Sequence, residues 1–161
     1  MSLVLLSFKT KVNEVDIKYK SFLSDLAYLE SRGNHRLYGN GYIGKYQFST
    51  YVFKELKYNF NYNKFATDKN YFNEQEQDIQ CLKLFKIYKT YLNKYLLVYK
   101  NKTINGIKMN EAAILSATHL VGIGSMGKFF ESGLTFIPKD GNNVSILHYM
   151  KTFQKYEDLT F

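Results

Sequence analysis

The sequence predicts a mainly helical protein of the α+β class, folded as a single domain over residues 1–161. Its length suits one domain. Apolar residues recur at spacings of three and four in several segments, as in amphipathic helices, whereas turn signals concentrate in one Gly- and Tyr-rich stretch. With 45% hydrophobic residues and one Pro, the composition is that of a compact globular protein and excludes a disordered chain.

The N-terminal half predicts a helix over about 13–30, then a turn-rich segment over 36–48 that forms a small hairpin or an irregular loop. A short helix over about 49–58 and a polar loop over 59–73 follow. The stripe of the first helix is apolar: Tyr19, Phe22, Leu23, Leu26 and Leu29. Residues that end or cap these helices are Gly33, Asn34 and Ser49.

The C-terminal half predicts a long helix over about 73–100, a connection over 101–109 and a helix over 110–120. A short helix over 125–132, a turn over 138–143 and a final helix complete the chain. Capping or breaking residues are Asn73 with Glu76, Asn110, Gly122, Gly124, Gly133 and Asn143. The stripe of the final helix contains Ile146, Tyr149, Met150, Phe153 and Tyr156.

Cys81 is the only cysteine, which excludes an intramolecular disulfide and predicts a buried thiol. The apolar run from Leu3 to Leu6 has no basic residues before it and no small-residue cleavage site after it. It is too short for the core of a signal peptide or for a membrane span. We therefore expect no signal peptide, no stable membrane insertion and synthesis in the cytoplasm.

The formal net charge of +8 indicates a polyanionic partner. Nucleic acid, anionic lipid headgroups and the acidic bacterial cell wall all fit this charge. The Lys residues are spread along the chain and the aromatic residues form no ribonucleoprotein-type motif, which argues against nucleic-acid recognition. A basic nucleic-acid-binding module remains an alternative, and it would show salt-sensitive DNA binding that does not need Glu30.

Glu30 is the first candidate catalytic residue. It continues the apolar stripe at the end of the first helix, just before the Gly-rich segment. Cleavage of a glycosidic bond needs a carboxylic acid that still carries its proton near neutral pH, and partial desolvation beside apolar side chains supplies this property. A side chain that turns into water at a frayed helix end is the competing interpretation.

The residues around Glu30 form a recognisable motif. Glu30-Ser31 is followed by Gly41-Tyr42-Ile43-Gly44-Lys45-Tyr46-Gln47. This resembles the goose-type lysozymes and soluble lytic transglycosylases, in which a Glu-Ser pair precedes Gly-Ala-x-Gly-Leu-Met-Gln. The gap from the acid to the first glycine is about one residue shorter, and Tyr42, Lys45 and Tyr46 replace smaller or apolar residues. The Gly-Lys-Tyr-Gln-Phe loop is similar to a phage and bacterial branch of this group.

Two further segments resemble later motifs of the same group. The segment from Ile114 to Gly124 is similar to a variant of the third motif that reads Ala-Ala-His-Leu-x-Gly, which places His119 as a substrate-orienting residue or a structural one. Asp140-Gly141-Asn142-Asn143 and the following helix match a turn before a Tyr-containing helix, in which Tyr149 corresponds to the tyrosine near the catalytic glutamate. The three matches follow in order from about Leu26 to Phe153.

The resemblance implies a lysozyme-like fold: a helical bundle around a long central helix, with the hairpin or loop lining a substrate groove. It implies cleavage of the β-1,4 bond between N-acetylmuramic acid and N-acetylglucosamine in peptidoglycan, with Glu30 as the catalytic acid. Substrate-binding positions would be Ser31, Gly44, Tyr46, Gln47, His119 and Tyr149. No cofactor is implied, and the absence of a second His or Cys at ligand spacing predicts no metal site.

The choice of chemistry depends on a second carboxylate, which a hydrolase needs to activate water or to act as nucleophile. No Asp or Glu lies between Glu30 and Glu55. This favours a lytic transglycosylase, in which the substrate's own C6 hydroxyl attacks. A muramidase that uses Glu55, Asp68, Glu74 or Asp140 is the alternative, and so is a glycan-binding component of a phage or secretion apparatus.

The resemblance also carries expectations about partners and place of action. Peptidoglycan glycan strands are the expected partner. Because no signal peptide is expected, phage lysis, a secretion machine or a fusion partner would have to deliver the protein to the cell wall. An inhibitor or immunity protein that occupies the groove is a further possible partner.

Overall fold

A computed structural model describes residues 19–156 and residue 159. The apolar run from Leu3 to Leu6 and the first residues of the predicted N-terminal helix lie outside this part. Contacts divide the chain into two compact units, Met1–Cys81 and Leu82–Phe161. The single domain stays a prediction. The predicted class is confirmed: the described chain is mainly helical and carries two small antiparallel sheets.

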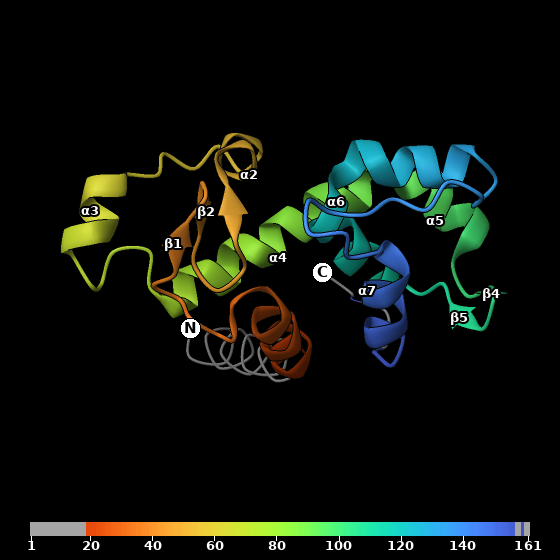
Figure 1. Cartoon of the computed structure of the whole chain (residues 1–161), viewed down its shortest axis with the longest axis horizontal. Coiled ribbons are helices and arrows are strands. Elements are labelled where there is room, and N and C mark those ends of the chain that lie inside the picture. The colour runs from red at the N-terminus through yellow and green to blue at the C-terminus, as the bar shows by residue number, and fades with distance from the viewer. Residues whose placement is uncertain (1–18, 157–158, 160–161) are drawn as a thin grey trace, which may run out of the picture. The chain divides into compact units, whose positions relative to one another are not determined.

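The first unit contains a helix described over residues 19–31 and a three-stranded sheet in the order β1-β2-β3, which lies between that helix and α2 in Figure 1. Asn40 and Gly41 have φ of 53° and 82°, which joins β1 to β2 through the primed hairpin turn that an Asn-Gly pair favours. The predicted hairpin is therefore confirmed. The elements are β1 Tyr38–Gly39, β2 Tyr42–Ile43, β3 Phe48–Ser49, α2 Thr50–Glu55 and α3 Tyr62–Thr67.

Aromatic side chains fill much of the core of the first unit. Phe48, Phe53 and Phe72 are buried, with ring centroids 5.5–5.9 Å apart. Phe65 and Phe60 extend this cluster toward α3. Arg36 closes its edge, because its guanidinium lies 4.0 Å from the centre of the Phe65 ring and donates to the carbonyls of Phe65 and Tyr71.

The second unit contains a short hairpin and two long helical segments. Its elements, with the helix that spans the unit boundary given first, are α4 Glu74–Tyr91, α5 Asn93–Tyr99, β4 Thr103–Ile104, β5 Ile107–Lys108, α6 Glu111–Glu131 and α7 Ile146–Phe153. Asn110 caps α6 through the amide of Ala113. Gly122 breaks α6 with a φ of 79° and a ψ of 163°. The predicted cap and the predicted break at Gly122 are confirmed.

The predicted elements differ from the structure at four places. The helix expected over 73–100 is interrupted at Leu92, whose ψ of 5° is not helical. The expected connection over 101–109 is a hairpin, in which Asn105 and Gly106 form the turn. The polar loop over 59–73 contains α3, capped by Asn61. The final helix is capped by Ser145 instead of Asn143, because Asn143 has a φ of 66° and belongs to the preceding turn.

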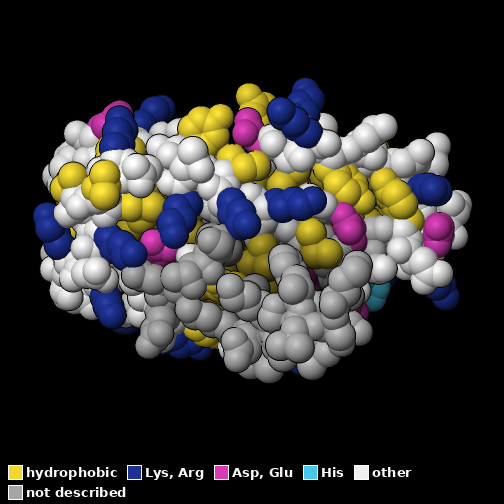
Figure 2. Space-filling view, turned by 180° about the vertical axis from the view of Figure 1, so that it is seen from behind, with side chains coloured by type: hydrophobic (Ala, Val, Ile, Leu, Met, Phe, Trp, Pro, Cys, Tyr) yellow, Lys and Arg dark blue, Asp and Glu magenta, His cyan; other side chains and the backbone are white. Residues whose placement is uncertain are grey.

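The charged surface agrees with the scattered Lys pattern of the sequence. In Figure 2, Lys and Arg side chains recur over the face drawn, interrupted by hydrophobic side chains. Among the residues that the structure describes, no helix has the length and apolar character that crossing a membrane would need.

Candidate active site

Glu30 lies in the last turn of the first helix, at the edge of the buried face. Phe22 and Leu26 on this face are fully buried, and Glu30 is half-buried. The helix ends where Arg32 and Gly33 both adopt positive φ, of 57° and 79°; the amide of Arg32 donates to the carbonyl of Tyr28 and the amide of Gly33 to that of Ala27. The predicted end of the helix is thus confirmed, and it holds Glu30 on ordered helical backbone.

Ser31 connects the end of this helix to the Gly-rich loop. Its hydroxyl lies 3.2 Å from the carbonyl oxygen of Ala27, in its own helix, and 2.9 Å from that of Lys45. Lys45 stands in the turn between β2 and β3. The two halves of the first motif, separated by 14 positions in the chain, are therefore in direct contact.

Gln77 holds the other side of this turn. Its side chain is fully buried, and its Oε1 accepts from the amide of Lys45 at 2.7 Å. Its Nε2 donates to the carbonyls of His35 and Phe72 at 2.9 and 2.7 Å. A Cβ on Gly44 would lie 2.3 Å from that Oε1. Glycine is required here because the turn packs against Gln77 and because φ is +74°.

A cluster of charged side chains lies beside the same turn. The Lys45 ammonium is 2.8 Å from Asp78 Oδ1 and 3.9 Å from Glu74 Oε2. The hydroxyl of Tyr46 donates to the same Asp78 Oδ1 at 2.6 Å. His35 Nδ1 lies 3.2 Å from Glu74 Oε1. Burying a Lys side chain is unfavourable without an anionic partner, and Asp78 supplies that partner to Lys45.

Cys81 lies on the same face of α4 as Asp78, and its pKa is affected by the carboxylate of Glu30. The thiol is fully buried, as predicted. Burial raises its pKa first, and the carboxylates of Asp78 and Glu30 raise the pKa further, against an opposing effect of Lys45. Two carboxylates from different segments thus act on one buried thiol. Burial also raises the pKa of Tyr46, with smaller contributions from Cys81 and Asp78.

The predicted substrate-binding residues of the loop are occupied in packing the turn. Gln47 Nε2 donates to the carbonyl of Gly44 at 2.8 Å, so this side chain braces its own turn. Gly44 is buried against Gln77. Tyr46 is fully buried, so its ring contributes to the core, and its predicted contact with a substrate stays a prediction. Ser31 acts as a connector.

His119 and Tyr149 belong to the second unit. The ring of His119 lies edge-on to Phe85, with centroids 6.0 Å apart, and its Nδ1 is buried. Tyr149 is 5% exposed on α7, and its ring packs against His148 and Phe153. Both residues are therefore integrated into the core side of their helices. Their roles toward a substrate stay predictions.

The residues that α4 contributes lie outside the sequence motifs. Glu74, Gln77, Asp78 and Cys81 follow the spacing i, i+3, i+4 and i+7, which places them on one helix face. This row of residues on one helix face was the sequence signal that could have identified them. The apolar stripe expected for the long helix begins only at Leu82 and does not include them. Within the described part of the chain, no group of three or more His, Cys, Asp or Glu side chains is arranged to hold a metal ion.

The chain matches no protein-family model, no curated protein and no solved structure.

Proposed function

We propose that this protein is a peptidoglycan-cleaving glycosidase with a lysozyme-like fold, in which Glu30 is the catalytic acid. The observation that carries the proposal is the contact between Ser31 and the carbonyl of Lys45. It joins the Glu-Ser pair to the Gly-x-x-Gln turn, the two parts of the sequence motif. A half-buried carboxyl at the end of a fixed helix, next to a braced turn, suits proton transfer at a defined position.

In the favoured chemistry, Glu30 gives its proton to the glycosidic oxygen as the bond from that oxygen to C1 of the muramic acid breaks. The oxygen of the C6 hydroxyl then bonds to C1, and its proton returns to Glu30. The products are a shortened glycan and a 1,6-anhydro ring. An attacking group that belongs to the substrate has a large proximity advantage and needs no positioned water.

The alternative is a muramidase, and one observation favours it. Asp78 is a second carboxylate in the first unit, and Lys45 and Tyr46 hold it beside the turn that Ser31 contacts. It is half-buried, so one face remains accessible to solvent. A hydrolase would use Asp78 to activate water or as a nucleophile, depending on the separation of the two carboxyl groups. Both named contacts to Asp78 fall on Oδ1, which fixes the orientation of the carboxylate.

The test is clearance of a suspension of purified peptidoglycan. We expect Glu30→Gln to lower the rate by about 10²–10⁴-fold, the usual contribution of general acid catalysis, with unchanged circular dichroism. Glu131→Gln is the matched control, because Glu131 is an exposed glutamate of the second unit. Equal rates for the Glu30→Gln and unaltered proteins would disprove the catalytic assignment.

Two further results separate the alternatives. Mass spectrometry of the products distinguishes anhydro-muramic ends, made by a transglycosylase, from reducing ends that have gained water. If the unaltered protein binds glycan strands but does not cleave them, the protein is better described as a non-catalytic glycan-binding component of a phage or secretion apparatus.

A further inference from the structure

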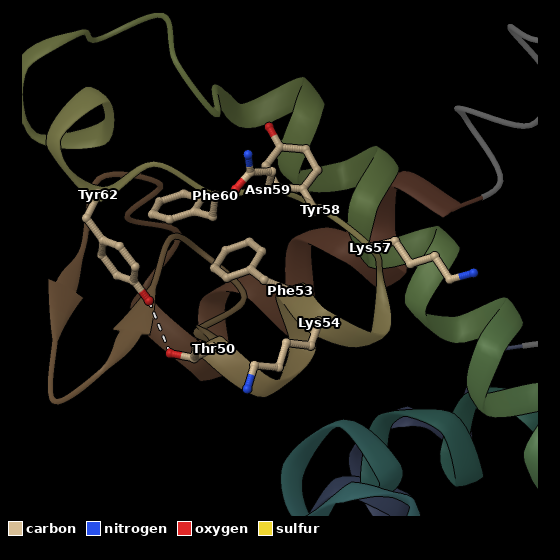
Figure 3. A pocket seen from close by; sticks show the side chains of 8 residues that line it. All are labelled: Thr50, Phe53, Lys54, Lys57, Tyr58, Asn59, Phe60 and Tyr62. Carbon is tan, nitrogen blue, oxygen red and sulfur yellow. Dashed lines mark hydrogen bonds between the residues drawn. The ribbon is translucent and has the colours of Figure 1, made fainter.

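A pocket of about 330 Å³ lies between α2 and the segment that follows it in the first unit (Figure 3). It opens three residues after Gln47, at Thr50, the first residue of α2. Its lining combines aromatic rings, neutral polar groups and lysine side chains. Such a mixture is typical of sites that bind a small organic ligand with both apolar and charged parts.

The aromatic wall is preformed. The rings of Phe53 and Phe60 stack with centroids 4.4 Å apart, and Tyr62 meets Phe60 edge-on at 5.0 Å. Tyr58 packs against Phe53 at 5.9 Å. Tyr62 is also exposed, so part of this wall faces solvent. Rings held in this way offer apolar contact at low entropic cost, because they are already immobilised.

Polar groups line the rim of the pocket. The hydroxyls of Thr50 and Tyr62 lie 3.1 Å apart and hydrogen-bond to each other, as Figure 3 shows. In the same view the side-chain amide of Asn59 lies at the opposite edge of the rings. Hydroxyl and amide groups at two edges provide donors and acceptors for a ligand that carries amide bonds.

Lys54 supplies the charge. Within the described residues, neither Lys54 nor Lys57 forms an ion pair, although both are exposed lining residues. Figure 3 shows the ammonium of Lys54 on the same side of Phe53 as Thr50, whereas Lys57 points away from the rings. One ammonium without an ion pair on the Thr50 side of the lining suits a carboxylate. Phosphate sites use several convergent donors, such as backbone amides or an Arg fork.

We propose that this pocket binds the peptide substituent of the glycan strand, with a peptide carboxylate paired to Lys54 and the amide-linked chain against the Tyr and Phe wall. The proposal rests on the proposed function, because it assigns the part of the same substrate that lies next to the Gln47 turn. The protein would therefore favour peptide-substituted strands over bare ones.

The first test measures binding without cleavage. N-acetylmuramoyl-L-alanyl-D-isoglutamine, with one free carboxylate, and its carboxamide analogue are titrated by isothermal calorimetry against the unaltered protein, Lys54→Gln and Lys57→Gln. We expect the carboxylate form to bind about two- to fivefold more tightly than the amide, the effect of one solvent-exposed ion pair. Lys54→Gln should remove this preference, and Lys57→Gln should keep it.

Three results would overturn the proposal: no saturable binding of the carboxylate form, equal affinity for the two forms, or an equal loss in both variants. Clearance of peptidoglycan by the same preparation is measured in parallel. A protein that cleaves peptidoglycan but does not bind the muramoyl peptide would disprove the peptide pocket alone. A protein that binds the peptide but does not cleave would disprove the proposed enzymatic function.

A second test uses the unaltered protein on two insoluble substrates, intact peptidoglycan and glycan from which an amidase has removed the peptides. We expect faster cleavage of the intact material, and Lys54→Gln should reduce that difference. Equal rates on both substrates would contradict a peptide-binding role.

Discussion

Replacing Gly44 by Ala tests how tightly the turn beside Glu30 is packed. Two costs add. The φ of +74° belongs to the left-handed region, where a residue with a Cβ costs about 1–2 kcal/mol. The new Cβ would also lie 2.3 Å from Gln77 Oε1 and 2.7 Å from Gln77 Cδ. Gln77 must therefore move away and release the amide of Lys45, and an unpaired buried donor costs about 1–3 kcal/mol. We expect a total loss of about 2–5 kcal/mol in the free energy of unfolding.

Gly41→Ala is the matched control. Its φ of +82° carries the same backbone cost, but no described atom within 4 Å would meet the added Cβ. Urea denaturation, followed by far-ultraviolet circular dichroism, gives the loss for each variant from the midpoint and slope. The difference between the two losses isolates the contact with Gln77. Equal losses would refute the packing argument and leave only the backbone contribution.

Two further predictions concern buried groups of the same cluster. Tyr46→Phe removes the hydrogen bond to Asp78 and should lower the free energy of unfolding by about 1 kcal/mol. Because the ring is buried, we expect the KM for peptidoglycan fragments to stay unchanged. A raised KM would show that Tyr46 reaches the substrate. Burial raises the pKa of Cys81, so above pH of about 8.5 the unfolded thiol loses its proton before the folded one does, and stability falls with rising pH by up to about 1.4 kcal/mol per unit. Denaturation at pH 8 and 9.5 should show a smaller fall for Cys81→Ala than for the unaltered protein, and equal falls would contradict this assignment.

Local signals in the sequence were sufficient for much of the fold. The pair Asn40-Gly41 supplies the two left-handed residues of a primed turn, and Asn110 has the short acceptor side chain that caps a helix. Gly122 breaks α6 because its φ of 79° is accessible to glycine. Each of these features depends on residues within a few positions of each other, which sequence reasoning can evaluate.

The errors have two different causes. Asn105-Gly106 carries the same turn signal as the first hairpin, but strands of two residues show no alternation of apolar and polar residues that would mark them. The interruption of the helix at Leu92 has no equivalent local signal, since Leu is a good helix former and lies in the apolar stripe. Its side chain is buried at the interruption, as its place in the apolar stripe predicts.

The candidate site was predictable only in part, because half of it comes from a distant helix. Glu30, Ser31 and the glycines were predicted from the resemblance of their motif to the lysozyme-like group. Gln77 and Asp78 lie more than 30 positions from the turn that they hold, and the contacts of Lys45 with both are long-range. No pattern in the turn itself indicates that its amide needs an acceptor from α4.

The partners from α4 also explain two departures from the lysozyme-like motif. Lys45 and Tyr46 stand where the resembling proteins carry smaller or apolar residues, and both contact the same oxygen of Asp78. A buried ammonium and a buried hydroxyl would be unfavourable at these positions without this carboxylate. The three residues therefore form one polar unit beside the turn. The contacts with Lys45 and Tyr46 give Asp78 a positioning role, and this role is sufficient to explain why a carboxylate stands there. We therefore continue to favour the proposed single-acid chemistry of Glu30 over hydrolysis by two carboxylates.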